Sequence, residues 1–405
     1  MVEGWLDQRS PPRRGVCRAA QRPQIHPRHL HARHRRRPDA DSRHREDRAR
    51  GVAVTLRRIA IAILIAIAAI AGVVLVFNQQ RRARETQTAA AAAPRNGRFI
   101  DAGDLRIFVQ ESGPPDAPAV LLVHGTGTWS EIWRETIDAL SADHRVIAVD
   151  LPPFGYSDKP AVASAYTREA QARRLIRVIE SLQVGVEQAF QPAPGRQVGK
   201  PVPHHGKVTI VGHSVGARPV VEVALLAPQL LSKLILVDPA LGFQSKRDDA
   251  PHFAQNRPSW IQQSLFSTPS LRTAVISAYG TNPMFLRQVF RSFVSNKSAV
   301  TQGRLDVIER PMHVRGTTAA YGAWLNVLTT SEDRSLSSDF TNFRRLSMPV
   351  AILWGRTDSV TPLWQGERLQ QLIPHSQLVI LDGVGHIPYI EDPPRFTAAL
   401  RKLLP

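Results

Sequence analysis

The chain of 405 residues contains one cysteine, Cys17, which lies among its first 50 residues. A single cysteine forms no internal disulfide and supplies no thiolate cluster for a metal. Lysine is absent from residues 1–98, where 21 arginines and 7 acidic residues give a net charge of +14. The remaining residues carry 31 basic and 27 acidic side chains. This near neutrality argues against a nucleic-acid partner for residues 99–405.

Residues 1–57 form a basic leader rich in arginine, histidine and proline. Its central stretch, RHLHARHRRRPDA, has neither a helical nor a strand period, so we expect the leader to be disordered. A second hypothesis starts from VAVTLRR, which resembles the beginning of a membrane-targeting sequence. Under that hypothesis the leader is translated upstream sequence and the chain starts at a valine such as Val52 or Val54.

Polar side chains are absent from residues 59–77, IAIAILIAIAAIAGVVLVF. As a helix with a rise of ~1.5 Å per residue, this run nearly spans the ~30 Å hydrocarbon core of a bilayer. It is longer than a signal-peptide core, so we predict an uncleaved transmembrane helix over residues 58–78. The arginine-rich leader favours the cytoplasm on its own side, which places the residues after the span on the extracytoplasmic side. Residues 79–96 are polar and alanine-rich and are predicted to be a linker.

Short apolar runs that end in a polar residue or glycine follow this linker. One alternates like a strand, and the others are continuously apolar, as expected of strands buried on both faces. We therefore predict an α/β fold with a mostly parallel sheet, helices on both faces and functional residues at the carboxyl ends of the strands. The strand-like runs cover residues 105–112, 119–125, 145–150, 208–213, 234–239, 350–355 and 377–383, and helical patterns cover residues 131–140, 168–182, 215–226 and 364–372.

One serine lies at a corner between a strand-like run and a helical pattern. In VGHSVGA, Ser214 is flanked by Gly212 and Gly216, where larger side chains would collide with the neighbouring strand and helix. Such a turn projects the hydroxyl above the sheet and aims the first amides of the helix at a nearby oxyanion. We interpret Ser214 as a nucleophile rather than as a helix-capping serine.

A serine nucleophile needs a base, and the base needs an acid that fixes its tautomer. His386 in LDGVGHIPYIEDP follows the last strand-like run, and Asp358 in LWGRTDSVTP follows the one before it. The order serine, aspartate, histidine is the order expected of a hydrolase with a nucleophile elbow. Asp238 in LVDPA also ends a strand-like run, so it is an alternative to Asp358 as the acid.

An oxyanion hole needs two backbone amides. One is the amide of Val215, which follows the nucleophile, and HGTGTW at residues 124–129 supplies a second, most simply that of Thr126. We expect His124 to brace this loop rather than to transfer protons.

Together HGTGTW, VDLPPFGYSDKP, VGHSVGA, LWGRTDSVTP and GVGHIPYIEDP resemble the α/β-hydrolase fold over residues 97–405. The resemblance implies Ser214 as nucleophile, His386 as general base and then acid, Asp358 as its orienting carboxylate, and the amides of Thr126 and Val215 as oxyanion hole.

Within this family the chain is most similar to the branch of haloalkane dehalogenases, epoxide hydrolases, meta-cleavage product hydrolases and small esterases. In VDLPPFGYSDKP, Pro153 stands where the family more usually has glycine, at a place away from the chemistry. The dehalogenases and epoxide hydrolases of the branch use an aspartate as nucleophile. Ser214 therefore favours acyl transfer to water.

The resemblance also implies a core of residues 97–240 and 348–405 with a helical cap, residues 241–347, inserted between them. We expect most aromatic residues of the cap to pack on the core and a few to line an apolar acyl pocket. These aromatic residues are Phe243, Phe253, Trp260, Phe266, Phe285, Phe290, Phe293, Tyr321 and Trp324. A second insertion, residues 184–206, carries His204 and His205, a pair without nearby carboxylates that we do not interpret as a metal site.

The sequence thus predicts a membrane-anchored serine hydrolase of a small to medium apolar ester, with no cofactor and no metal. One alternative is carbon–carbon bond hydrolysis of the meta-cleavage type, which needs a carboxylate-binding arginine such as Arg218. Another is a catalytically silent binding protein that keeps the hydrolase fold. The oligomeric state stays open.

Overall fold

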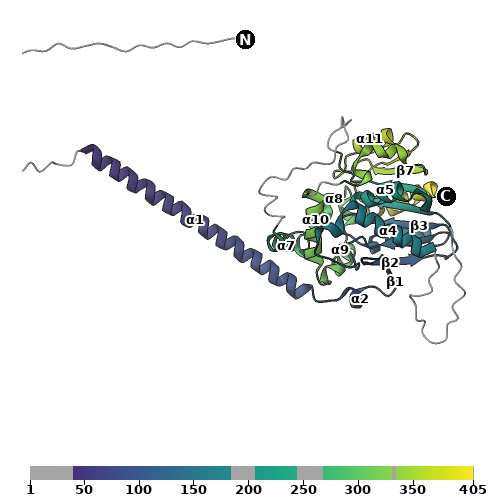
Figure 1. Cartoon of the computed structure of the whole chain (residues 1–405), viewed down its shortest axis with the longest axis horizontal. Helices are drawn as coiled ribbons and strands as arrows, with labels where there is room; N and C mark the ends of the chain where they lie inside the picture. The colour runs from purple at the N-terminus through teal and green to yellow at the C-terminus, as the bar shows by residue number, and fades with distance from the viewer. Residues whose placement is uncertain (1–39, 184–205, 244–267, 331–333, 405) are drawn as a thin grey trace, which may run out of the picture. The chain divides into compact units, whose positions relative to one another are not determined.

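The computed structural model describes residues 40–183, 206–243, 268–330 and 334–404 (Figure 1). Most of the leader, including Cys17, lies outside these residues, as do His204, His205 and three cap aromatics, Phe253, Trp260 and Phe266. The chain divides into two compact units, Met1–Ala66 and Ile67–Pro405.

Helix α1 (Ala40–Arg84) contains the predicted transmembrane segment. It is long enough to cross a membrane, and the mean hydropathy of its most apolar window is 3.2. The helix begins within the leader, so the disorder expected for residues 40–57 is wrong. Arginine and alanine, which are frequent there, are strong helix formers, and extending an existing helix costs far less than nucleating one.

Eight strands form one sheet in the order β1-β2-β4-β3-β5-β6-β7-β8. Strands β1 and β2 pair antiparallel, as do β2 and β4, and the other pairs are parallel. Every strand-like run of the sequence is a strand, and β1 at the edge is an addition. The strands are β1 (Gly97–Asp101), β2 (Arg106–Ser112), β3 (Ala119–Val123), β4 (Arg145–Val149), β5 (Val208–His213), β6 (Leu231–Val237), β7 (Val350–Gly355) and β8 (Gln377–Leu381).

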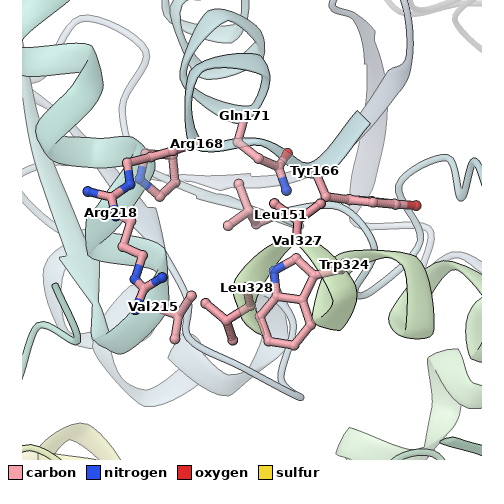
Figure 2. Close-up of a pocket in the computed structure, with 10 residues that line it drawn as sticks. Leu151, Tyr166, Arg168, Gln171, Val215, Arg218, Trp324, Val327 and Leu328 are labelled. Atoms are coloured by element: carbon pink, nitrogen blue, oxygen red, sulfur yellow. The ribbon is translucent and has the colours of Figure 1, made fainter. Parts of the chain in front are cut away.

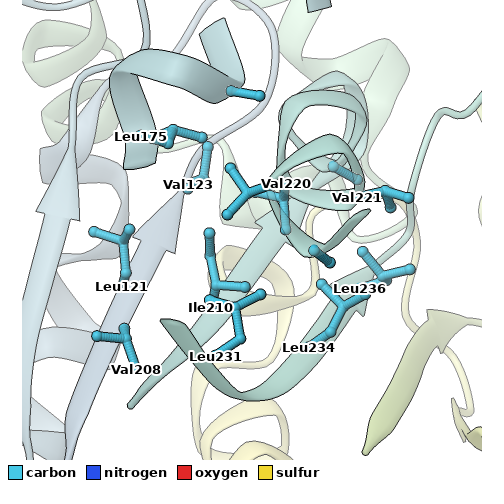
Figure 3. Packing of buried hydrophobic residues seen from close by; sticks show 14 of the residues in the cluster. Leu121, Val123, Leu175, Val208, Ile210, Val220, Val221, Leu231, Leu234 and Leu236 are labelled. Atoms are coloured by element: carbon cyan, nitrogen blue, oxygen red, sulfur yellow. The ribbon is translucent and has the colours of Figure 1, made fainter. Parts of the chain in front are cut away.

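Helices cover both faces of the sheet, as expected. Figure 3 shows part of the core on one face, where apolar residues of α4, α5 and the strands interlock. On the other face, α3 and α13 pack against the alternate side chains of the same strands. The core helices are α3 (Arg134–Leu140), α4 (Arg168–Gln183), α5 (Ala217–Leu226), α11 (Trp364–Leu372), α12 (Pro388–Glu391) and α13 (Pro393–Leu403).

The cap is helical in its described part. It comprises α7 (Pro269–Ala278), α8 (Pro283–Phe293), α9 (Gln302–Glu309) and α10 (Thr317–Thr330). Residues 334–347, expected in the cap, instead pack on the core. The Glu222 carboxylate of α5 accepts the backbone N–H groups of Leu336 and Ser337 at 3.0 and 2.6 Å, and Phe340 and Phe343 join the core cluster. Short 3-10 turns have no hydrophobic period that would have revealed this boundary.

The segment expected to be a linker, residues 79–96, also lies against the folded body. Glu85 is buried, and its carboxylate accepts the backbone N–H of Thr318 at 2.9 Å. Gln87 forms a bridge with Val314, and the short helix α2 (Ala89–Ala92) packs on an aromatic cluster. A buried carboxylate, small alanine side chains and backbone hydrogen bonds attach this segment to the body. The composition of residues 79–96 gives no sign of these contacts.

Candidate active site

Ser214 lies at the corner that the sequence predicts. Strand β5 ends at His213, and Ser214 has a φ of +52°, a left-handed conformation that costs energy for any residue except glycine. A Cβ atom on Gly212 would lie 2.9 Å from Cα of Ala217 in α5, and one on Gly216 would lie 2.1 Å from the carbonyl oxygen of His124. Both glycines are therefore required for the close approach of strand, loop and helix.

The loops after β7 and β8 bring Asp358 and His386 to Ser214. The Ser214 hydroxyl lies 2.9 Å from Nε2 of His386, and Nδ1 of His386 lies 2.7 Å from Oδ2 of Asp358. All three side chains are buried. The geometry fits a neutral imidazole with its proton on Nδ1. This N–H donates a hydrogen bond to Asp358, and Nε2 accepts one from the Ser214 hydroxyl.

Asp358 is held as a carboxylate by several donors. Its Oδ1 accepts the backbone N–H groups of Val360 at 2.7 Å and Thr361 at 2.9 Å, and Oδ2 accepts the Thr361 hydroxyl at 2.6 Å. Burial opposes ionisation here, but the hydrogen bonds from His386 and Thr361 hold the pKa of Asp358 below its ordinary value. Asp358 is thus a charged partner for a positive imidazolium.

Asp238 has a different environment. It follows β6 with a φ of +42°, and its Oδ1 accepts the backbone N–H of Gly355 at 2.8 Å, while its buried Oδ2 accepts no hydrogen bond from the described residues. Burial and the neighbouring charge of Asp358 raise the pKa of Asp238 well above its ordinary value. Of the two candidate acids, Asp358 is the one that accepts the hydrogen bond from His386.

The loop after β3 lies close to Ser214. A Cβ on Gly125 would come within 2.9 Å of Cβ of Ser214. Among the described residues, the backbone N–H groups of Thr126 and Val215 donate to no protein acceptor. His124 braces the loop, because its Nε2 accepts the N–H of Leu151 at 2.9 Å and its Nδ1 donates to the carbonyl of Gly125 at 2.7 Å. Burial lowers the pKa of His124 to about 4, so the ring is neutral.

Two residues beside the site were missed by sequence reasoning. The His213 ring donates from Nε2 to the carbonyl oxygen of His386 at 2.8 Å, and its Nδ1 accepts the Tyr389 hydroxyl at 3.0 Å. Burial, followed by the nearby His386, lowers the pKa of His213 to about 3. Both residues stand inside the quoted motifs, but no spacing rule indicated that they would meet and hold the His386 loop.

Two cavities lie between the cap and the core. The larger is lined by Val215, by apolar residues of α10 and by Arg168 and Arg218 (Figure 2). Figure 2 shows the two arginines on one side and Trp324 on the other. Nε of Arg218 donates to the carbonyl of Ala240 at 2.7 Å, and Nη1 of Arg168 donates to the carbonyl of Ser337 at 2.8 Å.

The smaller cavity lies beside the loop after β3. It is lined by Gly127 and Thr128 of that loop and by Thr281, Thr317 and Tyr321 of the cap. No group of three or more histidine, cysteine, aspartate or glutamate side chains within the described ranges has the arrangement of a metal site.

The fold and the elbow define a class of protein, and sequence comparison agrees with them. Residues 118–393 match the α/β hydrolase fold family, and the chain belongs to this family.

Known relatives carry out two kinds of hydrolysis. The chain is similar to the pimeloyl-[acyl-carrier protein] methyl ester esterase of Vibrio parahaemolyticus, at 26% identity over 70% of this chain and 93% of the relative. It is similar to the 2-hydroxy-6-oxononadienedioate/2-hydroxy-6-oxononatrienedioate hydrolase of Cupriavidus pinatubonensis, at 25% identity over 71% and 88%. A serine hydrolase of carbazole degradation shares the fold, with a TM-score of 0.56 and 23% identity over 76% of this chain and 98% of that one.

Proposed function

We propose that the protein is a membrane-anchored serine hydrolase that cleaves carboxylic esters of small to medium apolar acids through Ser214, His386 and Asp358. The observation that carries this proposal is the relay of hydrogen bonds from Asp358 through His386 to a serine at positive φ. The name of the methyl ester esterase among the relatives supports the reaction type.

The first step forms an acyl-enzyme. The Ser214 oxygen attacks the ester carbonyl while Nε2 of His386 takes the hydroxyl proton, and Asp358 stabilises the resulting imidazolium. The backbone amides of Thr126 and Val215 donate to the oxyanion of the tetrahedral intermediate. His386 then gives its proton to the alkoxide, which leaves as the alcohol.

The second step returns the free enzyme. Water attacks the acyl carbonyl while His386 takes one of its protons, and the same two amides hold the second oxyanion. When this intermediate collapses, the carboxylic acid leaves and the proton passes from His386 back to the oxygen of Ser214.

Hydrolysis of p-nitrophenyl esters from acetate to palmitate by the detergent-solubilised full chain tests the proposal. Ser214→Ala should lower kcat by roughly 10⁴–10⁶-fold, while the matched control Ser141→Ala, a serine whose hydroxyl bonds only to a carbonyl of its own turn, should retain activity. A fluorophosphonate should label the unaltered chain and not Ser214→Ala. Turnover that survives in Ser214→Ala would refute the assignment of the nucleophile.

A second candidate function is carbon–carbon bond hydrolysis of the meta-cleavage type. The observation that favours it is the presence of Arg168 and Arg218 in the larger cavity beside Val215, where a guanidinium group can bind a substrate carboxylate. The name of the Cupriavidus pinatubonensis relative points the same way. A 2-hydroxy-6-oxo-dienoate discriminates the two, since its turnover should exceed that of every p-nitrophenyl ester if this candidate is right.

The membrane anchor is residues 58–78 of α1. Its support is the hydropathy of the helix and the exposure of its large apolar side chains. The arginine-rich leader favours an extracytoplasmic position for the catalytic part. Alkaline phosphatase fused after Pro405 should be active, and an inactive phosphatase together with a fluorescent green fluorescent protein fusion would reverse this topology.

A further inference from the structure

The carboxyl end of α1 lies against the folded body along one face. Val74, Phe77, Asn78, Arg81 and Arg84 are partly buried, at the three- and four-residue spacing of one helical face. The residues between them are exposed. The last turns of α1 therefore have one face partly covered, and Glu85, the residue that follows the helix, is itself bound to the body rather than part of a free spacer.

A chain of hydrogen bonds joins this helix end to the cap. Arg81 pairs with Glu85 at 3.3 Å, and the Glu85 carboxylate accepts both the backbone N–H and the hydroxyl of Thr318 at the start of α10. The Thr318 hydroxyl also lies 2.7 Å from that of Thr281, in the turn between α7 and α8. The α7–α8 turn is thus fixed two contacts away from the end of the anchor.

This turn presents large apolar side chains to solvent. Tyr279 is 66% exposed and Met284 is 71% exposed, and the Tyr279 ring stacks on that of Phe285 with centroids 5.2 Å apart. Exposed Arg287 and Arg291 follow on the next turns of α8. An apolar tip bordered by arginines is the composition that suits the surface of a membrane with anionic lipids.

The length of the tether sets how far this turn can lie from the bilayer. The apolar run ends at Phe77, and Glu85 lies eight residues later, which is about 12 Å along a helix. The headgroup layer adds roughly 5–8 Å on each side of the hydrocarbon core. Thr318, which is bound to Glu85, is consequently held close to the headgroups, on whichever side of the membrane the body lies.

We propose that the α7–α8 turn, residues 279–284, contacts the bilayer that holds α1. The exposed Tyr279 and Met284, the arginines beside them and the short tether through Glu85 and Thr318 carry the proposal. This inference rests on the proposed membrane anchor.

Single cysteines test the contact in the full chain. In a Cys17→Ser background, Met284→Cys, Val76→Cys and Gln371→Cys are labelled with an environment-sensitive fluorophore and reconstituted into phosphatidylcholine–phosphatidylglycerol vesicles. Val76 is an exposed residue of the predicted span, and Gln371 is an exposed residue of α11, which lies away from α7 in Figure 1. Nitroxide lipids should quench position 284 at least about twofold more than position 371, because interfacial apolar groups lie roughly 5–10 Å into the headgroup and acyl boundary.

The three positions separate the ways in which the idea can fail. Quenching at 76 and 284 but not at 371 supports it. Quenching at 76 alone overturns the contact while keeping the anchor. No quenching at 76 refutes the anchor and this inference together. Hydrolysis of p-nitrophenyl acetate by the same samples reports separately on the proposed ester chemistry.

Discussion

The variants Asp358→Asn and Asp238→Asn together show which of the two carboxyl groups orients His386. In Asp358→Asn, the two backbone N–H groups at Oδ1 select the carbonyl oxygen of the new amide, at 2.7 and 2.9 Å. The NH₂ group then faces Nδ1 of His386, 2.7 Å away. A donor at this position requires an unprotonated Nδ1, so the ring proton moves to Nε2, toward Ser214. Such an imidazole cannot accept the serine proton.

The magnitude follows from this change of tautomer. Loss of the correct tautomer costs a serine hydrolase on the order of 10⁴-fold in kcat. At about 1.36 kcal/mol for each factor of ten, this is roughly 5.4 kcal/mol of barrier. In Asp238→Asn, by contrast, the amide oxygen can keep the N–H of Gly355, and a neutral amide replaces a carboxyl group whose pKa burial raises well above its ordinary value. We expect that variant to lose less than about tenfold in kcat, because a shift within one hydrogen bond is worth only ~1 kcal/mol.

The assay is kcat for the best p-nitrophenyl ester at pH 8, with thermal unfolding of each variant as the control for folding. A loss of roughly 10⁴-fold in Asp238→Asn, beside a near-normal Asp358→Asn, would show that the acid acts from β6 and that the relay drawn here is wrong. Equal, small losses in both would mean that neither carboxyl group fixes the tautomer of His386.

Three further variants probe the surroundings of the site. Gly125→Ala places a methyl group 2.9 Å from Cβ of Ser214 and should lower kcat at least ~10²-fold. The control Gly303→Ala, where a Cβ meets no atom within 4 Å, should leave kcat unchanged. A fully active Gly125→Ala would refute the close approach of the loop after β3 to Ser214. His213 takes up a proton near pH 6.5 in the unfolded chain but only near pH 3 in the folded chain, so the free energy of unfolding falls as the pH drops through this range. In urea titrations, His213→Gln should remove up to ~1.4 kcal/mol per pH unit of this pH dependence. An unchanged pH dependence would contradict a buried neutral His213 ring. Glu85→Ala leaves buried donors of Thr318 without an acceptor and should cost about 1–3 kcal/mol of unfolding free energy in the same titrations, with a smaller loss for Glu85→Gln; equal stability would show that the contact contributes nothing.

The sequence allowed most of the sheet to be predicted, because parallel strands buried on both faces must be continuous apolar runs. Strand β1 escaped because GRFID is a short edge strand of mixed character. Helix α13 was not singled out, although PPRFTAALRKL is amphipathic and begins with prolines, which suit the first turn of a helix. In these two cases the signal was weak or unused rather than absent.

The site divides in the same way. Ser214, Asp358 and His386 follow strands, and the chemistry proposed for them needs their residue types, so pattern and order singled them out as candidates. The competition between Asp358 and Asp238 could not be resolved from sequence, because both follow buried strands. It depends on which carboxyl group meets Nδ1 of His386, and that is a matter of loop conformation. The contact between His213, at the end of β5, and Tyr389 of α12 likewise joins two elements far apart in the sequence, and no local period encodes it.

The segment after the membrane helix shows the limit of hydropathy most clearly. Residues 79–96 have the composition of a spacer, yet Glu85 binds the start of α10 and α2 packs on buried aromatic rings. Helix α10 also lines both cavities between the cap and the core, through Val327 and Tyr321 among others. A chain cut at residue 97 would therefore lose contacts that hold the start of α10. Measurements of substrate preference are for this reason best made on the full chain.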